Sequence, residues 1–156
     1  MAGVNGLHHT CYTVSDLAGS LAFYRDVLGC EVLAEQEKAG GYLAAIVGYP
    51  DAHVRMAHLR VPGGDHVIEL FEYVAPAGSA ADVEPCNVGA SHLCFLVDDL
   101  PALYERLRRA GVDTFVSPPV EVDTGINRGG FALYLRDPDG ITVELFQPAR
   151  QPADGV

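Results

Sequence analysis

The sequence repeats one pattern twice, and this repeat constrains the fold more than any other feature. In each half, a histidine precedes an Asp-Leu pair by seven residues, and a helical pattern ending in glycine follows. The histidine–aspartate pairs are His9–Asp16 and His92–Asp99. Each half then closes with an apolar segment around one glutamate, Glu69 or Glu144. Because three features recur in the same order, the sequence predicts two copies of one supersecondary unit.

Local patterns predict a βαβββ order in each half. Runs rich in β-branched and aromatic residues predict strands, and leucines at helical spacing predict a helix that Asp16 caps and Gly29 ends. In the first half the expected elements are strands 9–14, 30–36, 54–61 and 66–73, a helix from Leu17 to Leu28 and a short helix over 41–47. In the second half they are strands 90–97, 119–122, 129–136 and 140–147, with a helix over 100–110. This order predicts an α+β fold.

The repeat also predicts the domain organisation. We expect a single domain over residues 1–156, built of modules 5–74 and 89–148, with a linker over 75–88 and a frayed polar tail over 149–156. The two modules are expected to form a curved mixed sheet around a metal-binding cavity. In the second module, the Asp-Pro-Asp-Gly sequence at 137–140 is a turn signal, which makes the last two strands a hairpin.

The charge of the chain excludes two classes of partner. Ten Lys and Arg against 21 Asp and Glu give a net charge of −11, whereas nucleic acids and anionic membranes bind positively charged surfaces. No segment is apolar enough to span a bilayer, and the first six residues do not resemble a signal peptide. The four cysteines form no CxxC motif, so reduced thiols and a cytoplasmic location are expected.

Strand periodicity predicts a metal site. Successive side chains of a strand alternate between its two faces, so the repeated histidines and glutamates lie opposite the aliphatic positions. An unpaired carboxylate is costly to bury between aliphatic neighbours. The predicted ligands are His9, Glu69, His92 and Glu144, and a two-fold arrangement of the modules would bring them together. Two imidazoles and two carboxylates suit one divalent ion of Ni, Co, Zn, Mn or Fe, with about two coordination positions left open.

Other histidines are less suited to this role. His8 competes with His9 for the first position, but only His9 repeats the spacing of His92 in the second half. His53, His58 and His66 are interpreted as loop or strand-surface residues.

Further residues are candidates for the wall of the site. Cys11 and Cys94 each follow a predicted ligand by two residues on the same face. We interpret them as small residues that fill space near the metal, although soft extra ligands are an alternative. Arg60, Arg128 and Arg136 are candidates for an anionic substrate group, or simply solvated surface residues.

Several motifs resemble one known superfamily. They are the Phe-Tyr-Arg-Asp-Val-Leu-Gly segment at 23–29 and the Arg-Asp-Pro-Asp-Gly segment at 136–140 with the Val-Glu-Leu at 143–145. With the repeated histidines, these segments resemble the vicinal oxygen chelate superfamily, which includes glyoxalases, bleomycin-resistance proteins and extradiol dioxygenases. The resemblance implies metal ligands on the first and last strands of each half, at His9, Glu69, His92 and Glu144, and a homodimer.

The full His-Glu-His-Glu set looks like glyoxalase I and the acyl-CoA epimerases. The resemblance implies an isomerase, lyase or epimerase that moves a proton next to a carbonyl of a small molecule. A metal-bound enediolate would be stabilised by the ion as a Lewis acid, and Glu144 or Glu69 would act as the base. Thr13 and Leu96 stand where glutathione-binding residues occur in some members. The substrate class is therefore left open among glutathione adducts, other thiol conjugates, acyl-CoAs and unrelated carbonyl compounds.

Two other functions remain open at this point. An extradiol-type dioxygenase would hold Fe²⁺ with two histidines and one glutamate, and Glu69 would then stay off the metal. A metal-free drug-binding or resistance protein would instead stack aromatic side chains on its guest. The aromatic candidates are Phe71, Tyr73, Phe131, Tyr134 and Phe146.

Overall fold

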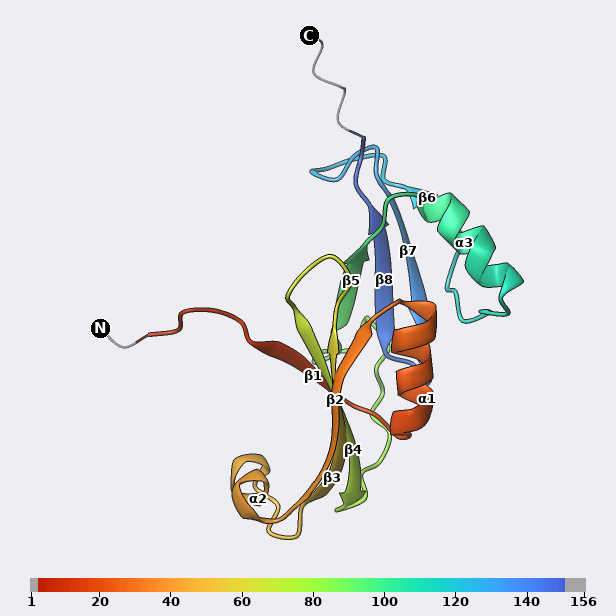
Figure 1. Ribbon diagram of the computed structural model, residues 1–156. Coiled ribbons are helices and arrows are strands. Elements are labelled where there is room, and N and C mark those ends of the chain that lie inside the picture. Colours follow the sequence, from red (N-terminus) through yellow and green to blue (C-terminus); the bar gives the residue numbers. More distant parts are fainter. Residues whose placement is uncertain (1–2, 151–156) are drawn as a thin grey trace. The chain divides into compact units, whose positions relative to one another are not determined.

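The computed structural model describes residues 3–150, and it divides into two compact units between Ala80 and Ala81. Each unit holds one four-stranded mixed sheet with at least one helix packed on it (Figure 1). The predicted α+β class and its two modules are confirmed. Among the described residues, no helix has the length and apolar character needed to cross a membrane. The expected tail falls outside the described part of the chain from residue 151 onward.

The first unit has a short extra helix within the predicted βαβββ order. Its elements are β1 (His9–Thr13), α1 (Leu17–Ala22), the π-helical turn η1 (Phe23–Val27), β2 (Glu31–Ala39), α2 (Gly41–Val47), β3 (His53–Arg60) and β4 (Val67–Ala75). The strand order is β1-β4-β3-β2. β1 runs parallel to β4, and the other pairs are antiparallel. The first and last strands of the module are therefore neighbours.

The second unit repeats this topology. Its elements are β5 (His92–Leu96), α3 (Leu100–Arg109), β6 (Val120–Glu121), β7 (Phe131–Arg136) and β8 (Thr142–Gln147). The strand order is β5-β8-β7-β6, and β5 runs parallel to β8. The register is also repeated, because Cys11 pairs with Glu69 in one sheet and Cys94 pairs with Glu144 in the other. Equivalent strands therefore place the predicted ligands at equivalent positions.

One face of each sheet is aliphatic and buried. In the first unit α1 packs on β3 and β4, over Leu59, Ile68 and Leu70, all of which have no exposed surface. In the second unit α3 packs on β8, where Val143 and Leu145 are 1% exposed. This burial leaves the glutamate of each final strand on the opposite face, as the periodicity predicted.

The first long helix starts as predicted but ends differently. The Asp16 carboxylate accepts hydrogen bonds from the backbone N–H groups of Ala18 and Gly19, which satisfies donors that lack an intrahelical partner. The predicted α-helix to residue 28 is wrong in its last turn, where residues 23–27 are π-helical and the N–H of Leu28 donates to the carbonyl of Phe23. The wider turn buries both Phe23 and Tyr24.

The hairpin between β7 and β8 forms as predicted. The Asp137 carboxylate accepts hydrogen bonds from the backbone N–H groups of Asp139 and Ile141, at 2.9 and 2.8 Å. Gly140 has a φ of +82°, a conformation that glycine adopts without steric cost. The turn fixes the register in which β8 presents Glu144.

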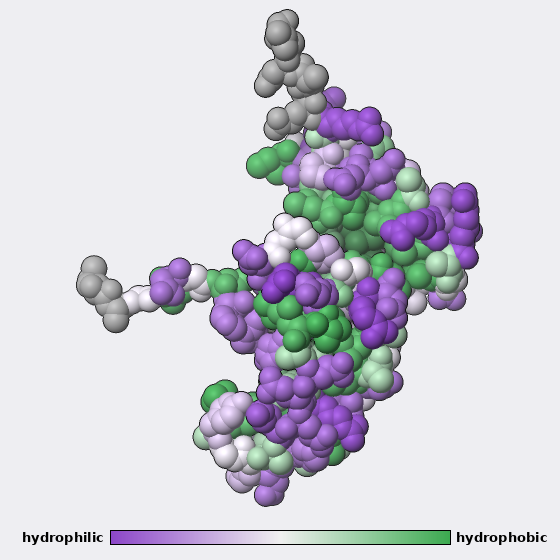
Figure 2. Space-filling model, viewed as in Figure 1, coloured by the Kyte–Doolittle hydropathy of each residue, from purple (hydrophilic) through white to green (hydrophobic). Residues whose placement is uncertain are grey.

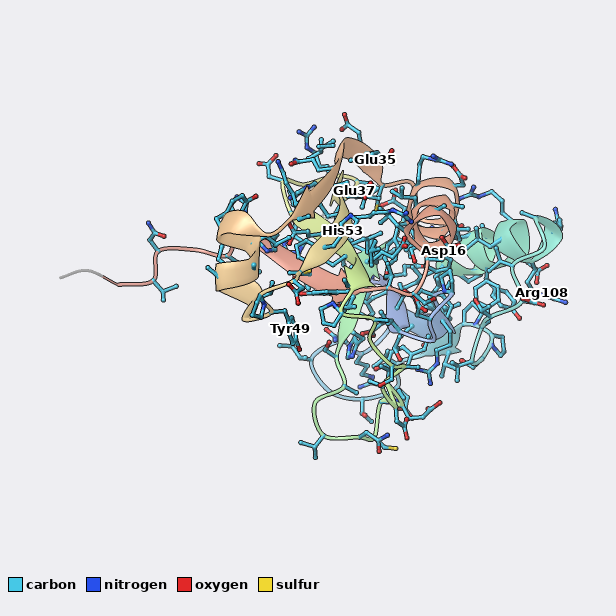
Figure 3. The ribbon with its side chains drawn as sticks, turned by 90° about the horizontal axis from the view of Figure 1, so that it is seen from below. Asp16, Glu35, Glu37, Tyr49, His53 and Arg108 are labelled. Atoms are coloured by element: carbon cyan, nitrogen blue, oxygen red, sulfur yellow. The ribbon has the colours of Figure 1, made fainter. Side chains whose placement is uncertain are left out.

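Charged side chains cover part of the first sheet. Arg60 pairs with Glu31, and Arg55 pairs with Glu72, each at 3.0 Å. Figure 2 shows hydrophilic residues gathered at the bottom of the view, over the lower part of β2 and β3 in Figure 1. In Figure 3, Glu37 of β2 lies next to His53 of β3, and His53 Nε2 is 2.5 Å from Glu37 Oε1.

Candidate metal centre

The first unit brings His9 and Glu69 together. His9 Nε2 on β1 lies 3.4 Å from Glu69 Oε2 on β4. Glu69 is almost fully buried, with 9% of its surface exposed, between Ile68 and Leu70 in sequence. A carboxylate in this setting needs polar partners, and the parallel pairing of β1 with β4 supplies one.

The second unit repeats the pair. His92 Nε2 on β5 lies 3.2 Å from Glu144 Oε2 on β8. Both side chains are more exposed than in the first unit, and 20% of the Glu144 side chain reaches solvent against 11% for Glu69. The repeat in the sequence is therefore also a repeat of one imidazole–carboxylate pair.

The separations in these pairs suit two donors of one metal ion. Two ligand atoms held about 2.1 Å from an ion at angles of 90–110° lie about 3.0–3.4 Å apart. The His9–Glu69 and His92–Glu144 pairs, at 3.4 and 3.2 Å, fall in this range. Imidazole nitrogen with carboxylate oxygen is also a donor set that first-row divalent ions accept. Each pair thus fits half of the predicted site.

Within residues 3–150, no group of three or more His, Cys, Asp or Glu side chains is arranged to hold a metal ion. Each unit by itself contributes two donors of the predicted set. The convergence of His9, Glu69, His92 and Glu144 on one ion stays a prediction.

His8 contacts the ring of His9 on the side away from Glu69. The two Nδ1 atoms are 2.8 Å apart, so one nitrogen donates a hydrogen bond and the other accepts it. When His9 donates, its Nε2 carries the lone pair that faces Glu69. Metal-binding histidines commonly donate their second N–H in this way. His8 is therefore placed to orient the His9 ring through this hydrogen bond.

His58 was missed by the sequence analysis. The interpretation of His58 as a loop or strand-surface residue is wrong, because His58 Nε2 lies 2.8 Å from Glu69 Oε1 and its side chain is 26% exposed. Strand β3 places it directly opposite Glu69 in the antiparallel register. The Nδ1 atom of His58 is buried and has no hydrogen-bond partner among the described residues. Glu69 therefore has two imidazole neighbours, one on each of its oxygens.

The remaining histidines do not join the site. His53 pairs with Glu37 on the charged part of the sheet. His66 Nε2 lies 3.1 Å from the Thr10 hydroxyl. Both agree with the predicted role as loop or strand-surface residues.

The three candidate arginines differ in their partners. Arg60 pairs with Glu31, and Arg136 binds Glu84, the Gly140 carbonyl and the Thr142 hydroxyl. Arg128 lies exposed in the segment between β6 and β7 and forms no ion pair with any described residue. It is the candidate whose guanidinium is not already engaged.

Aromatic residues extend the donor-bearing face of each sheet. In the first unit Phe71 and Tyr73 pack against a small buried cluster of Leu43, Val54 and Met56, which α2 covers. In the second unit the Tyr134 ring lies 5.3 Å from the His92 ring, centroid to centroid. Burial and the nearby Glu144 carboxylate raise the pKa of Tyr134, so its phenol stays protonated.

Both cysteines beside the candidate ligands carry protonated thiols. Parts of Cys11 and Cys94 reach the surface, but burial of the thiols and the adjacent carboxylates of Glu69 and Glu144 raise the pKa of each to about 12. A thiol is a weaker ligand and nucleophile than a thiolate. This supports the interpretation of the two cysteines as small neutral residues.

We expect Cys11 and Cys94 to resist alkylation in the metal-free protein. At pH 8 a thiol with a pKa of about 12 is ionised in roughly one molecule in 10⁴, so iodoacetamide should first modify Cys86, which is exposed. Peptide mass spectrometry over time measures the order. Modification of Cys11 or Cys94 at the rate of Cys86 would contradict the expectation.

Comparisons with known proteins agree on one superfamily. The profile of the Glyoxalase/Bleomycin resistance protein/Dioxygenase superfamily matches residues 6–145. The chain is 31% identical to a 2-epi-5-epi-valiolone epimerase of an Actinomyces species, over 96% of this chain and 84% of the relative. It is 33% identical to a lactoylglutathione lyase of Pseudomonas aeruginosa, over 90% and 81% of the two chains. A glyoxalase family protein of Bacillus cereus has the same fold, with a TM-score of 0.80, 20% identity and coverage of 96% and 97%.

Proposed function

Since the chain belongs to the glyoxalase/bleomycin resistance protein/dioxygenase superfamily, we propose that it is a metal-dependent isomerase, epimerase or lyase. It moves a proton next to a carbonyl group of a small organic substrate. The relatives include an epimerase and a lyase, which supports this reaction class over binding alone.

One observation carries the proposal. The same imidazole–carboxylate pair occurs in both units, at equivalent positions and with donor separations of 3.4 and 3.2 Å. A solvated surface face gives no reason for a mostly buried glutamate to recur within 3.4 Å of a histidine nitrogen in both sheets. The two pairs are the donors expected of one divalent site.

Each residue has a defined task in the proposed reaction. His9, Glu69, His92 and Glu144 hold the divalent ion, which supplies Lewis-acid polarisation of the substrate carbonyl when bound. A carboxylate of the set, Glu144 or Glu69, would detach from the ion and accept the proton from the carbon beside the carbonyl. It would return the proton to the opposite face of the same carbon in an epimerase, or to the neighbouring carbon in an isomerase. A general base of this kind contributes about 10²–10⁴-fold to the rate.

The substrate is expected to be a carbonyl compound without a glutathione group. Thr13 and Leu96 occupy exposed positions at the ends of β1 and β5 and carry no charge to bind a glutathione carboxylate. Arg128 is the side chain we propose for an anionic substrate group. The four cysteines are free, which supports a cytoplasmic location, and we propose that the enzyme works as a homodimer.

Metal content tests the proposal directly. The protein is purified as wild type, His9→Ala, Glu144→Ala and His53→Ala, and metals are quantified by mass spectrometry. We expect about one Ni, Co, Mn or Zn per chain in the wild type and loss of this metal in the first two variants. His53→Ala is the matched control, since His53 also pairs with a glutamate but on the charged surface, and it should keep the metal.

Other outcomes would redirect the assignment. Stoichiometric Fe²⁺ with oxygen-dependent turnover would favour the dioxygenase. Absence of metal under every loading condition would exclude the proposed chemistry and leave a binding protein. With metal confirmed, α-ketoaldehyde–thiol adducts and acyl-CoAs are the first substrates to screen, by deuterium incorporation from D₂O.

A further inference from the structure

The two halves of the candidate site differ in the residue that stands across from the glutamate on the neighbouring antiparallel strand. Across from each central glutamate, the antiparallel register places His58 opposite Glu69 in the first sheet and Tyr134 opposite Glu144 in the second. His9 matches His92, and Cys11 matches Cys94. The first unit therefore has an imidazole across from its glutamate, whereas the second unit has a phenol at the equivalent position.

The contact of His58 with Glu69 differs from the contacts of the candidate ligands. At 2.8 Å, His58 Nε2 is at the distance of a direct hydrogen bond to Glu69 Oε1. The His9 nitrogen stands 3.4 Å from the other oxygen, Oε2. One oxygen of Glu69 is therefore engaged within the protein, and the second faces the candidate metal donor.

Burial limits how far Glu69 can turn. Glu69 is 9% exposed, and a buried carboxylate that lost the His58 hydrogen bond would leave an oxygen without a partner. Glu144 has a more exposed side chain and one imidazole within 4 Å, that of His92, among the described residues. The second carboxylate is held less tightly than the first.

We propose that His58 is a positioning residue that fixes Glu69 by hydrogen-bonding Oε1 and directs Oε2 to the metal. The proposal rests on the proposed function, because it assigns a role at the same metal site. His58 does not itself bind the ion. It restrains one carboxylate of the pair, and no described residue of the second unit supplies an equivalent imidazole to Glu144.

The test compares two amides at position 58. In His58→Gln the side-chain N–H group reaches about as far as Nε2 of histidine, whereas in His58→Asn it ends one carbon short. Titration of the full-length metal-free protein with Co²⁺ gives the affinity, and the visible absorption of bound Co²⁺ reports the ligand field. Circular dichroism verifies that each variant is folded, and His53→Asn is the matched control outside the site.

We expect His58→Asn to weaken Co²⁺ binding about 10–100-fold, the range seen when a partner of a ligand is removed, and to change the absorption bands. His58→Gln should restore affinity and spectrum, and His53→Asn should leave both unchanged. If wild-type protein binds Co²⁺ and His58→Asn binds it equally well with the same spectrum, the proposal for His58 is wrong while the proposed function stands.

If the wild type binds no divalent ion, the proposed function fails, and the positioning of Glu69 is tested in the metal-free protein. The melting temperature should fall in His58→Asn but not in His58→Gln, and this fall should vanish in a Glu69→Leu background, where the partner is absent. An equal fall with and without the Glu69 carboxylate would overturn the His58–Glu69 interaction.

Discussion

Replacement of Glu144 with glutamine is expected to lower the proton-transfer rate by about 10²–10⁴-fold in metal-saturated protein. Glutamine keeps a neutral oxygen for the metal but cannot accept the substrate proton. Glu144 is the better candidate for the moving base because its side chain is 20% exposed, while Glu69 is buried between two imidazoles. Solvent-deuterium exchange into the substrate, measured at full metal occupancy, reports the rate.

The reciprocal variant separates the two carboxylates. Glu69→Gln should mainly weaken metal binding, and part of the exchange activity should return when excess metal is supplied. The assignment of the base would have to be reversed if Glu69→Gln abolished exchange at full occupancy while Glu144→Gln retained it.

Truncation of the aliphatic face has the largest expected effect on stability. Leu70→Ala should reduce the free energy of unfolding by about 2–5 kcal/mol, because it leaves a cavity in a packed core. Leu70 has no exposed surface, lies next to Glu69 and belongs to the face covered by α1. A loss of this size is a large share of the total stability of a small domain, about 5–15 kcal/mol. Urea denaturation followed by circular dichroism measures it.

Leu7→Ala is the matched control, since it removes the same atoms from a side chain that is 76% exposed. It should change the free energy of unfolding by less than about 0.5 kcal/mol. Leu145, which is 1% exposed, is the corresponding core position of the second unit and should behave like Leu70. Similar small losses for Leu7→Ala and Leu70→Ala would contradict the assignment of the buried face.

Local signals in the sequence were sufficient for most of the fold. Asp16 caps a helix because its side chain reaches N–H groups within three residues, and Asp137 closes a turn over four residues. Strand periodicity placed Glu69 on the face opposite Ile68 and Leu70, because successive residues of a strand point to alternate faces. The parallel pairing of β1 with β4 was not predicted, because it joins strands that lie far apart in the sequence.

The sequence could not predict contacts that depend on register between strands. His58 meets Glu69 only because β3 pairs antiparallel with β4 in one particular alignment. A shift of one residue would turn His58 to the other face. The spacing of the two strands around the turn over 61–66 sets this alignment, and residue type alone does not reveal it. The repeat did not indicate His58 either, because the equivalent position of the second sheet is occupied by Tyr134 and not by a histidine.

The parallel pairing of first and last strands has a consequence for folding kinetics. His9 and Glu69 are separated by most of their module in sequence, yet they are neighbours in the sheet. Their strands can meet only after the intervening chain has closed a long loop, which is slow relative to helix or hairpin formation. A nascent or partly folded chain therefore has its hairpins before its donor pairs. The ability to bind a divalent ion would therefore arise late in folding, once the first and last strands of each module have paired.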